Sequence, residues 1–162
     1  MLLNKWMKRH TLTLYAPMEG DIIPLEKVTD PVFSEKMMGD GIAIVPTDGT
    51  VVAPVDGTII QVAPTKHAIG LRSEDGAEIL IHVGLDTVEL AGSPFDVHVS
   101  VGDTVKAGQS LLTADLAQIQ QAGKDTVTPM VVTNGSELKE PYSFHTGGPA
   151  LPGKTVVAQA EQ

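Results

Sequence analysis

Cysteine is absent from the 162 residues of the chain. Disulfide bonds and thiolate chemistry are therefore excluded, and a metal ion would have to be held by histidine or carboxylate side chains. The sequence also lacks an apolar run of about 18 residues or more, which a membrane-spanning helix needs. Its first residues lack the long apolar stretch and the cleavage site of a signal peptide. We therefore expect a cytoplasmic protein.

Positive charge is scarce in this sequence. It has 11 lysine and arginine residues against 20 aspartate and glutamate residues, which gives a formal net charge of −9. A chain of this charge repels polyanions, so nucleic acid is not expected as a partner. Partners with basic patches are favoured instead.

What the sequence has in quantity is short β-like segments separated by turns. It contains 16 glycines and 11 prolines, with frequent valine, isoleucine and threonine. Asp-Gly or Gly-Asp pairs at 48–49, 56–57, 75–76 and 102–103 recur at a spacing typical of all-β folds. The expected strands lie within 11–17, 20–26, 42–46, 50–55, 57–63, 67–73, 77–84, 95–101, 110–116, 129–134 and 154–160. The prediction is an all-β sandwich or barrel that forms a single domain over residues 12–162.

Two short helices are expected to interrupt the strands. In the first, "DPVFSEKMMGDG", Asp30 can cap the helix, Pro31 suits its first position and Gly39 can end it. The second, "DLAQIQQAG", has Asp115 as its cap and Gly123 as its end.

Residues 1–11 differ in composition from the rest of the chain. Leucine, tryptophan and methionine side chains lie within helical reach of one another and are interleaved with lysine and arginine. A basic amphipathic segment of this kind suits a membrane surface, while a loose terminus or linker remnant is the more common case. We predict a flexible or amphipathic tail and leave both alternatives open.

The candidate chemistry lies in a predicted hairpin that carries two histidines. If the turn at Asp75-Gly76 has two residues, Ile69 pairs with His82 and His67 with Gly84. Both histidines then project from the same side of the sheet as diagonal neighbours about 7 Å apart. A three-residue loop would reverse this parity and separate the rings.

Two further residues belong to this predicted arrangement. Thr65 falls on the same face, where its hydroxyl can bond to the His67 ring and fix which nitrogen faces His82. Gly84, opposite His67, is expected to leave an empty place beside the rings. The remaining histidines, His10, His98 and His145, have no comparable neighbours, so we assign no function to them.

Two kinds of chemistry suit a histidine pair. One is a zinc site in a LytM-like peptidase or regulatory module, formed by His67, His82 and Asp86; "DVHVS" supplies only His98 for the downstream His-x-His that such peptidases need. The other is covalent phosphoryl transfer, in which a neutral ring nitrogen of one histidine takes up the group and the second stabilises its oxygens.

The surroundings of the pair suggest a docking surface. Phe33 and Met37 are four residues apart in the first predicted helix, with Met38 beside them. Such side chains are more often core, but methionines also suit a surface that accepts several partners. Asp30 and Asp86 would give this apolar patch an acidic rim, which suits a basic partner.

Four segments together resemble a known family. They are "FSEKMMGDGIAIVPTDGTVVAPVDGTI", "HAIGLRSEDGAEILIHVGLDTVEL", "VGDTVKAGQSLL" and "TPMVVTN". On these, the chain is identified as a member of the glucose-type enzyme IIA family of the bacterial phosphoenolpyruvate:sugar phosphotransferase system, over about residues 12–138. The family fold is an antiparallel β-sandwich with short helices. The resemblance implies a phosphocarrier that takes a phosphoryl group from phospho-HPr and passes it to a cysteine on the IIB domain of a sugar permease.

The resemblance also implies roles for the residues of the hairpin. His82 matches the histidine that is phosphorylated on Nε2, and His67 matches the second histidine, which stabilises the phosphoryl group. Thr65 matches the residue that orients His67. Gly84 matches the position whose backbone carbonyl holds the Nδ1 proton of the nucleophile. No cofactor and no metal are implied, beyond adventitious zinc at His67 and His82.

The same resemblance assigns the docking surface. Phe33, Met37 and Met38 match part of the hydrophobic ring around the histidines, and Asp30 and Asp86 match acidic positions that face arginine on HPr. Such proteins also regulate transporters or kinases according to their phosphorylation state. The sugar is not implied, because the IIC partner recognises it.

Two segments depart from the family pattern. Lys66 replaces a small polar residue between Thr65 and His67 and adds a positive charge near the site. The end of the chain, from residue 140, is atypical.

Overall fold

A computed structural model describes residues 11–161 of the chain. It has fourteen strands: β1 (Thr11–Tyr15), β2 (Gly20–Pro24), β3 (Asp40–Pro46), β4 (Thr50–Val52), β5 (Gly57–Val62), β6 (Ala68–Ser73), β7 (Glu78–His82), β8 (Phe95–Val97), β9 (Thr104–Val105), β10 (Ser110–Ala114), β11 (Thr128–Val132), β12 (Ser143–Phe144), β13 (Pro149–Ala150) and β14 (Val156–Glu161). The helices are α2 (Pro31–Ser34) and α3 (Leu116–Gln121), with 3₁₀ turns η1 (Leu25–Lys27), η2 (Thr87–Leu90) and η3 (Gly135–Glu137). Of the predicted tail at 1–11, residues 1–10 lie outside the described residues, and Thr11 is the first residue of β1.

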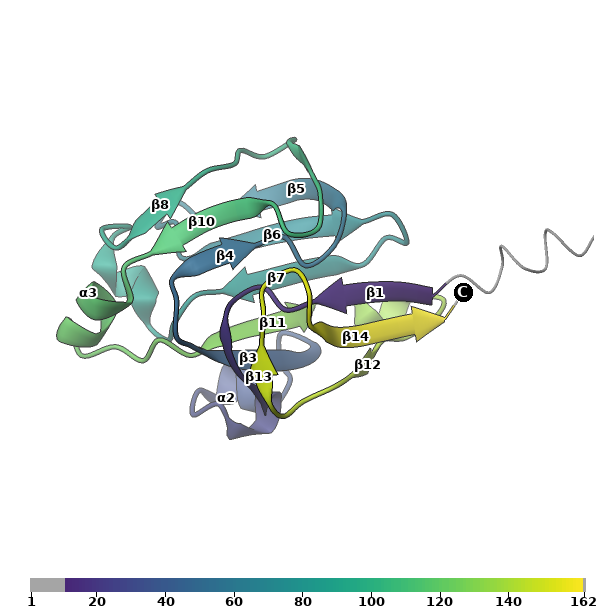
Figure 1. The fold of residues 1–162 in the computed structure, drawn as a ribbon, viewed down its shortest axis with the longest axis horizontal. Coiled ribbons are helices and arrows are strands. Elements are labelled where there is room, and N and C mark those ends of the chain that lie inside the picture. Colours follow the sequence, from purple (N-terminus) through teal and green to yellow (C-terminus); the bar gives the residue numbers. More distant parts are fainter. Residues whose placement is uncertain (1–10, 162) are drawn as a thin grey trace, which may run out of the picture.

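The strands form three antiparallel sheets. The largest has eight strands in the order β13-β2-β3-β11-β7-β6-β5-β9, and two smaller sheets have the orders β4-β10-β8 and β1-β14-β12 (Figure 1). The predicted fold, an antiparallel β-sandwich with short helices, is confirmed. Each of the eleven predicted segments overlaps a strand, whereas the very short β9, β12 and β13 were not predicted.

The main hydrophobic core lies between the large sheet and the smaller ones. It combines Ile79 and Ile81 of β7 with Leu111 and Leu112 of β10. Because side chains alternate along a strand, Leu80 and His82 point to the other side of β7. β7 is therefore anchored in the core by every second residue, and its remaining residues face outward.

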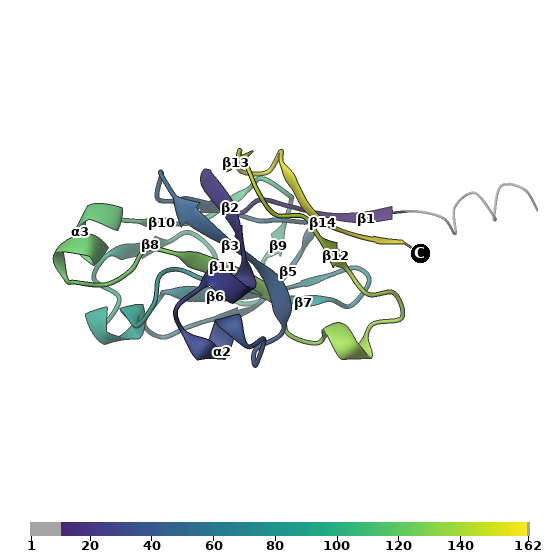
Figure 2. The same cartoon turned by 90° about the horizontal axis from the view of Figure 1, so that it is seen from below.

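A second, smaller cluster covers part of that outer face. It joins Leu25 of η1 and Phe33 of α2 to Ala43 and Val131, which belong to the neighbouring strands β3 and β11. Figure 2 shows α2 on one side of β3 and β11, and β1 and β14 on the other. This cluster fixes α2 on the outer face, next to the end of β7.

The two helices agree with the prediction to different degrees. α3 begins at the cap Asp115, whose carboxylate accepts a hydrogen bond from Gln118 N at 3.1 Å, and it is followed by Gly123 at φ +78°. α2 has the predicted cap Asp30, but it ends at Ser34 rather than Gly39. The early end arises because Lys36 adopts a left-handed conformation with φ +60°, so Met37 lies beyond the helix.

No helix among residues 11–161 has both the length and the hydrophobicity that a membrane crossing requires.

Candidate active site

The predicted register of the β6–β7 hairpin is wrong by one residue. Ala68, not Ile69, pairs with His82, because the loop contains three residues, 74–76, instead of two. Ser73 N donates to Ala77 O at 2.9 Å and Gly76 N to Ser73 O at 3.0 Å, which closes that loop. A regular continuation of this register would place His67 and His82 on opposite faces.

The two rings meet in spite of this register. Their centroids lie 4.7 Å apart with an interplanar angle of 79°. His67 precedes the first residue of β6 and follows Lys66, which has the left-handed φ of +63°, so it is not bound by the alternation of the strand. Val83 N nevertheless donates to His67 O at 2.7 Å, which ties the two strand ends together.

The backbone around Gly84 fixes the proton of His82. The Nδ1 atom of His82 lies 2.8 Å from Gly84 O. A carbonyl oxygen can only accept a hydrogen bond, so Nδ1 carries the proton and Nε2 keeps its lone pair.

The prediction that Gly84 leaves an empty place is wrong. Gly84 has φ +79°, and a Cβ atom there would lie 2.5 Å from Thr87 Cγ2 and 2.8 Å from Asp125 O. A glycine is needed at 84 because the backbone turns there in contact with its neighbours.

Small residues of β6 provide the free space instead. Ala68 is opposite His82 and Gly70 is opposite Leu80, and directly opposed residues share a face. They line a shallow hollow of about 310 Å³ that also contacts both histidines and Met38. These two residues were not predicted as part of the site; their small size within a strand is the only sequence signal for them.

His67 is held from its other side by Thr65. The Thr65 hydroxyl lies 2.7 Å from His67 Nδ1, as the sequence predicted. His67 is 8% exposed. Every fully buried side-chain nitrogen or oxygen in the described chain has a hydrogen-bond partner. Within the same residues, the Nε2 atoms of His67 and His82 have no hydrogen-bond partner. Both Nε2 atoms therefore retain some exposure.

Both imidazoles are held in their neutral form. Burial lowers the pKa of His82, and this effect outweighs the opposing contributions of the Gly84 carbonyl, Asp30 and Asp86. Burial also lowers the pKa of His67, and the neighbouring His82 lowers it further. Because a protonated imidazole has no free lone pair, a lowered pKa preserves the nucleophilic form at neutral pH.

The predicted docking residues surround this pair unequally. Phe33 is only 4% exposed, and its ring centroid lies 5.1 Å from that of His82. Met37 and Met38 are 71% and 38% exposed. Phe33 therefore supports the His82 ring from below the surface, whereas the two methionines offer apolar area to a partner.

The two carboxylates differ in what else they bind. Asp30 accepts a hydrogen bond from Val32 N at 3.0 Å and caps α2. Asp86 precedes η2 in a left-handed conformation, and its side chain makes no capping bond. Both are close enough to raise the pKa of His82, so both contribute negative potential at the ring.

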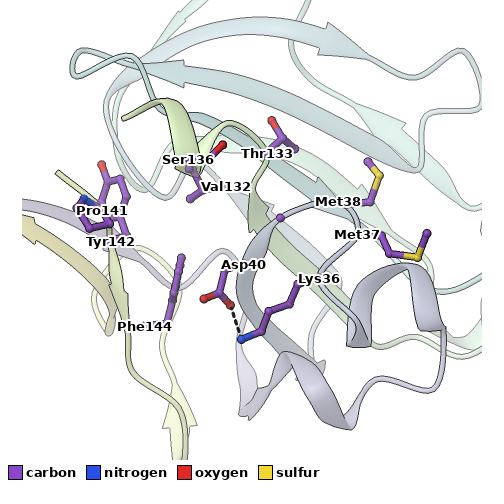
Figure 3. Close-up of a pocket in the computed structure, with 12 residues that line it drawn as sticks. Lys36, Met37, Met38, Asp40, Val132, Thr133, Ser136, Pro141, Tyr142 and Phe144 are labelled. Carbon is purple, nitrogen blue, oxygen red and sulfur yellow. Dashed lines mark ion pairs between the residues drawn. The ribbon is translucent and has the colours of Figure 1, made fainter. Parts of the chain in front are cut away.

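A second cavity of about 410 Å³ adjoins the hollow, and Met38 and Thr133 line both. Figure 3 shows Met37 and Met38 on one side of this cavity and Tyr142, from the atypical end of the chain, on the other. Lys36 and Asp40 form an ion pair of 3.4 Å between them. The end of the chain thus faces the exposed methionines across this cavity.

The zinc alternative is not supported by the side-chain arrangement. Within residues 11–161, no group of three or more histidine, cysteine, aspartate or glutamate residues is placed to hold a metal ion. The expected set of His67, His82 and Asp86 therefore does not assemble into a metal site.

A sequence model of the family described as "phosphoenolpyruvate-dependent sugar phosphotransferase system, EIIA 1" matches residues 12–138. The chain belongs to this family. EIIA proteins are phosphotransferases that relay phosphoryl groups and carry them covalently on histidine without a cofactor, and this chain is a phosphocarrier of that kind. The role of the family implies HPr and IIB as its partners.

Individual relatives agree with this assignment. The chain is 49% identical over 150 residues to a PTS system glucose-specific EIIA component of Bacillus cereus, a match that covers 93% of this chain and 90% of the relative. It is 49% identical over 151 residues to the PTS system glucose-specific EIICBA component of Streptococcus pneumoniae, of which it spans only 20%. The solved structure of glucose permease IIA from Mycoplasma capricolum superimposes with a TM-score of 0.82 at 38% identity, covering 93% of this chain and 96% of that one.

Proposed function

We propose that His82 is the phosphoryl carrier of this EIIA domain. The observation that supports it is the Nδ1–H···O bond to Gly84, which leaves the lone pair on the partly exposed Nε2. This lone pair attacks the phosphorus of phospho-HPr, so that a P–N bond forms at His82 as the one on HPr breaks. In the second half-reaction a cysteine thiolate of IIB attacks the phosphorus, and the Nε2–P bond electrons return to His82.

His67 acts on the transferring group without carrying it. When the Thr65 hydroxyl donates to His67 Nδ1, the ring proton resides on Nε2, which can donate to a phosphoryl oxygen beside His82. A preorganised donor of this kind stabilises charge that develops in the transition state. The ring separation of 4.7 Å places the two groups within reach of one phosphoryl group.

The surface around the histidines receives both partners. Met37 and Met38 supply exposed apolar area, Phe33 packs against the His82 ring, and Asp30 and Asp86 supply negative charge that attracts a basic partner. The same surface serves for binding of regulated transporters or kinases. Because the relatives are named glucose-specific, we propose glucose as the sugar of the permease. We also propose the cytoplasm as the compartment where the chain works.

Reconstitution with enzyme I, HPr and phosphoenolpyruvate tests this proposal. The chain should acquire one phosphoryl group that is stable at alkaline pH and lost in acid, and mass spectrometry of the intact phosphopeptide should place it on His82. His98→Ala is a matched control, since His98 bonds Ser110 at 2.8 Å on the other sheet and should not affect labelling. Phosphate on His67, or no phosphate from phospho-HPr, would overturn the assignment.

A further inference from the structure

Thr87 is a fully buried hydroxyl residue directly behind the active-site turn. Its exposed fraction is 0%, and it is one of five buried polar residues in the described chain. The hydroxyl donates to Val83 O at 2.6 Å. Thr87 touches neither histidine ring through a hydrogen bond, so its role must be exerted through the backbone that it contacts.

The methyl group of Thr87 contacts the same turn at a second point. Its Cγ2 atom lies 2.5 Å from the place that a Cβ atom at position 84 would occupy. The hydroxyl and the methyl group thus bear on two successive residues, Val83 and Gly84. A residue that lacks either group loses one of these contacts.

The backbone of the turn is also hydrogen-bonded on both sides of Gly84. Val83 N donates to His67 O at 2.7 Å and Leu85 N donates to Asp125 O at 3.0 Å. With the Thr87 hydroxyl on Val83 O, the peptide units before and after Gly84 are restrained. The orientation of the Gly84 carbonyl, which accepts from His82 Nδ1, depends on these restraints.

We propose that Thr87 is a positioning residue that fixes the protonation site of His82. By holding the Val83–Gly84 turn, it keeps the Gly84 carbonyl in line with Nδ1 and so selects the Nδ1–H tautomer. A neutral imidazole whose proton sits on Nε2 instead has no lone pair there to attack phosphorus. The inference about the tautomer stands on geometry alone; its effect on phosphoryl transfer rests on the proposed function of His82.

Two substitutions separate the hydroxyl from the shape of the side chain. Thr87→Val keeps the volume and the methyl contact with Gly84 but leaves Val83 O without its donor. Thr87→Ser keeps the donor and loses the methyl group. Ser73→Ala is the control, because Ser73 is also buried, and its hydroxyl donates to the Asp75 carboxylate in the turn at the opposite end of β7.

The primary measurement is the ¹⁵N chemical shifts of the His82 ring, which report the tautomer without any phosphorylation. Thr87→Val should raise the fraction of the Nε2–H form and lower kcat for phosphoryl acceptance about tenfold, the consequence of weakening one hydrogen bond, with KM for phospho-HPr unchanged. Thr87→Ser should restore the Nδ1–H form and bring kcat within about twofold of the parent. Ser73→Ala should leave both unchanged.

The outcomes distinguish the two proposals. If the His82 ring of Thr87→Val remains in the Nδ1–H form, the positioning role is wrong, whatever the rate. If the tautomer shifts as expected but the parent chain is phosphorylated elsewhere, the role of Thr87 stands and the role of His82 fails. Should Thr87→Val not fold, Thr87→Ala removes the same donor with a smaller side chain, and the same shift in tautomer is expected of it.

Discussion

The two ends of the β6–β7 hairpin use their polar groups in opposite ways. At the turn, the Tyr142 hydroxyl donates to Asp75 at 3.0 Å, and Ser73 donates to the same carboxylate. Asn134 donates to Gly76 O at 2.9 Å. Residues from the end of the chain and from the segment after β11 thus bind this turn.

At the open end the histidine rings contact each other edge to face, and only one nitrogen of each is bonded. The backbone beside them is hydrogen-bonded too, through Val83 N to His67 O and Leu85 N to Asp125 O. Hydrogen bonds of the backbone and of the turn therefore stabilise the hairpin. The Nε2 atoms of the two histidines make no such bond and stay available for chemistry.

The largest expected effect comes from removing the nucleophile at the open end. His82→Ala should abolish phosphoryl acceptance from HPr, because the neighbouring His67 Nε2 carries the ring proton when Thr65 donates to Nδ1 and then has no lone pair for attack. Radiolabelled phosphoenolpyruvate with enzyme I and HPr measures this. If the variant still acquired an acid-labile phosphoryl group, His82 would not be the nucleophile at the open end of the hairpin.

The second histidine should affect one half-reaction more than the other. His67→Gln should still accept the phosphoryl group, since His82 keeps its Gly84 bond. It should donate to IIB about 10²–10³-fold more slowly, the usual cost of losing one transition-state hydrogen-bond donor. Single-turnover assays of each half-reaction measure the two rates, and equal losses in both would contradict this division of roles.

The turn end should show the reverse behaviour. Tyr142→Phe removes the hydrogen bond to the Asp75 carboxylate and should lower the free energy of unfolding by about 1–2 kcal/mol, as measured in urea. Phosphoryl transfer should remain within about twofold of the parent. Ser136→Ala is the control, because Ser136 is exposed on η3 and lines the same cavity as Tyr142. It should change neither the stability nor the activity. If Tyr142→Phe lost phosphoryl transfer under conditions where it is fully folded, the turn would also affect the active site, and this prediction would be wrong.

Protonation of the open end should produce the smallest effect. Burial lowers the pKa of both histidines from the ordinary value of 6.5. As pH falls from 8 to about 6.5, the rate of phosphoryl acceptance should therefore hold, and it should decline only as the pH passes through the lower pKa of the folded state. An NMR titration of the His82 ring with a midpoint above 6.5 would contradict this.

The same pKa shift links pH to stability. Below about 6.5 the unfolded chain binds protons at these histidines while the folded chain does not, so the free energy of unfolding decreases until the lower folded pKa is reached. Urea unfolding of the parent and of the double variant His67→Gln, His82→Gln across this range isolates their contribution. The parent should lose more stability than the variant as the pH falls.

Much of the fold could be predicted because its signals are local. Alternating β-branched residues and Asp-Gly turns marked the strands, and Asp115 and Gly123 marked both ends of α3. The two left-handed lysines could not be predicted, since Lys36 and Lys66 have no side-chain preference for positive φ. Lys36 ends α2 early, and Lys66 frees His67 from the alternation of β6.

The contact between the histidines was predicted for the wrong reason. Glu74-Asp75-Gly76 is compatible with a two- or a three-residue loop, and the sequence does not reveal that Asp75 is bound by Tyr142, 67 residues away. The chosen loop gave adjacent rings, and the observed loop gives them only through the irregular backbone at 66–67. Thr87 was not assigned a role, because a threonine after Asp86 carries no sign of burial in the sequence.

The openness of the hollow beside His82 has a consequence for the rate of the relay. If His82 carries the phosphoryl group, HPr and IIB must each bring a reacting atom to the same Nε2, so one must dissociate before the other can bind. A partner that dissociates slowly would therefore slow the relay. A carrier of this kind works best when it holds both partners weakly.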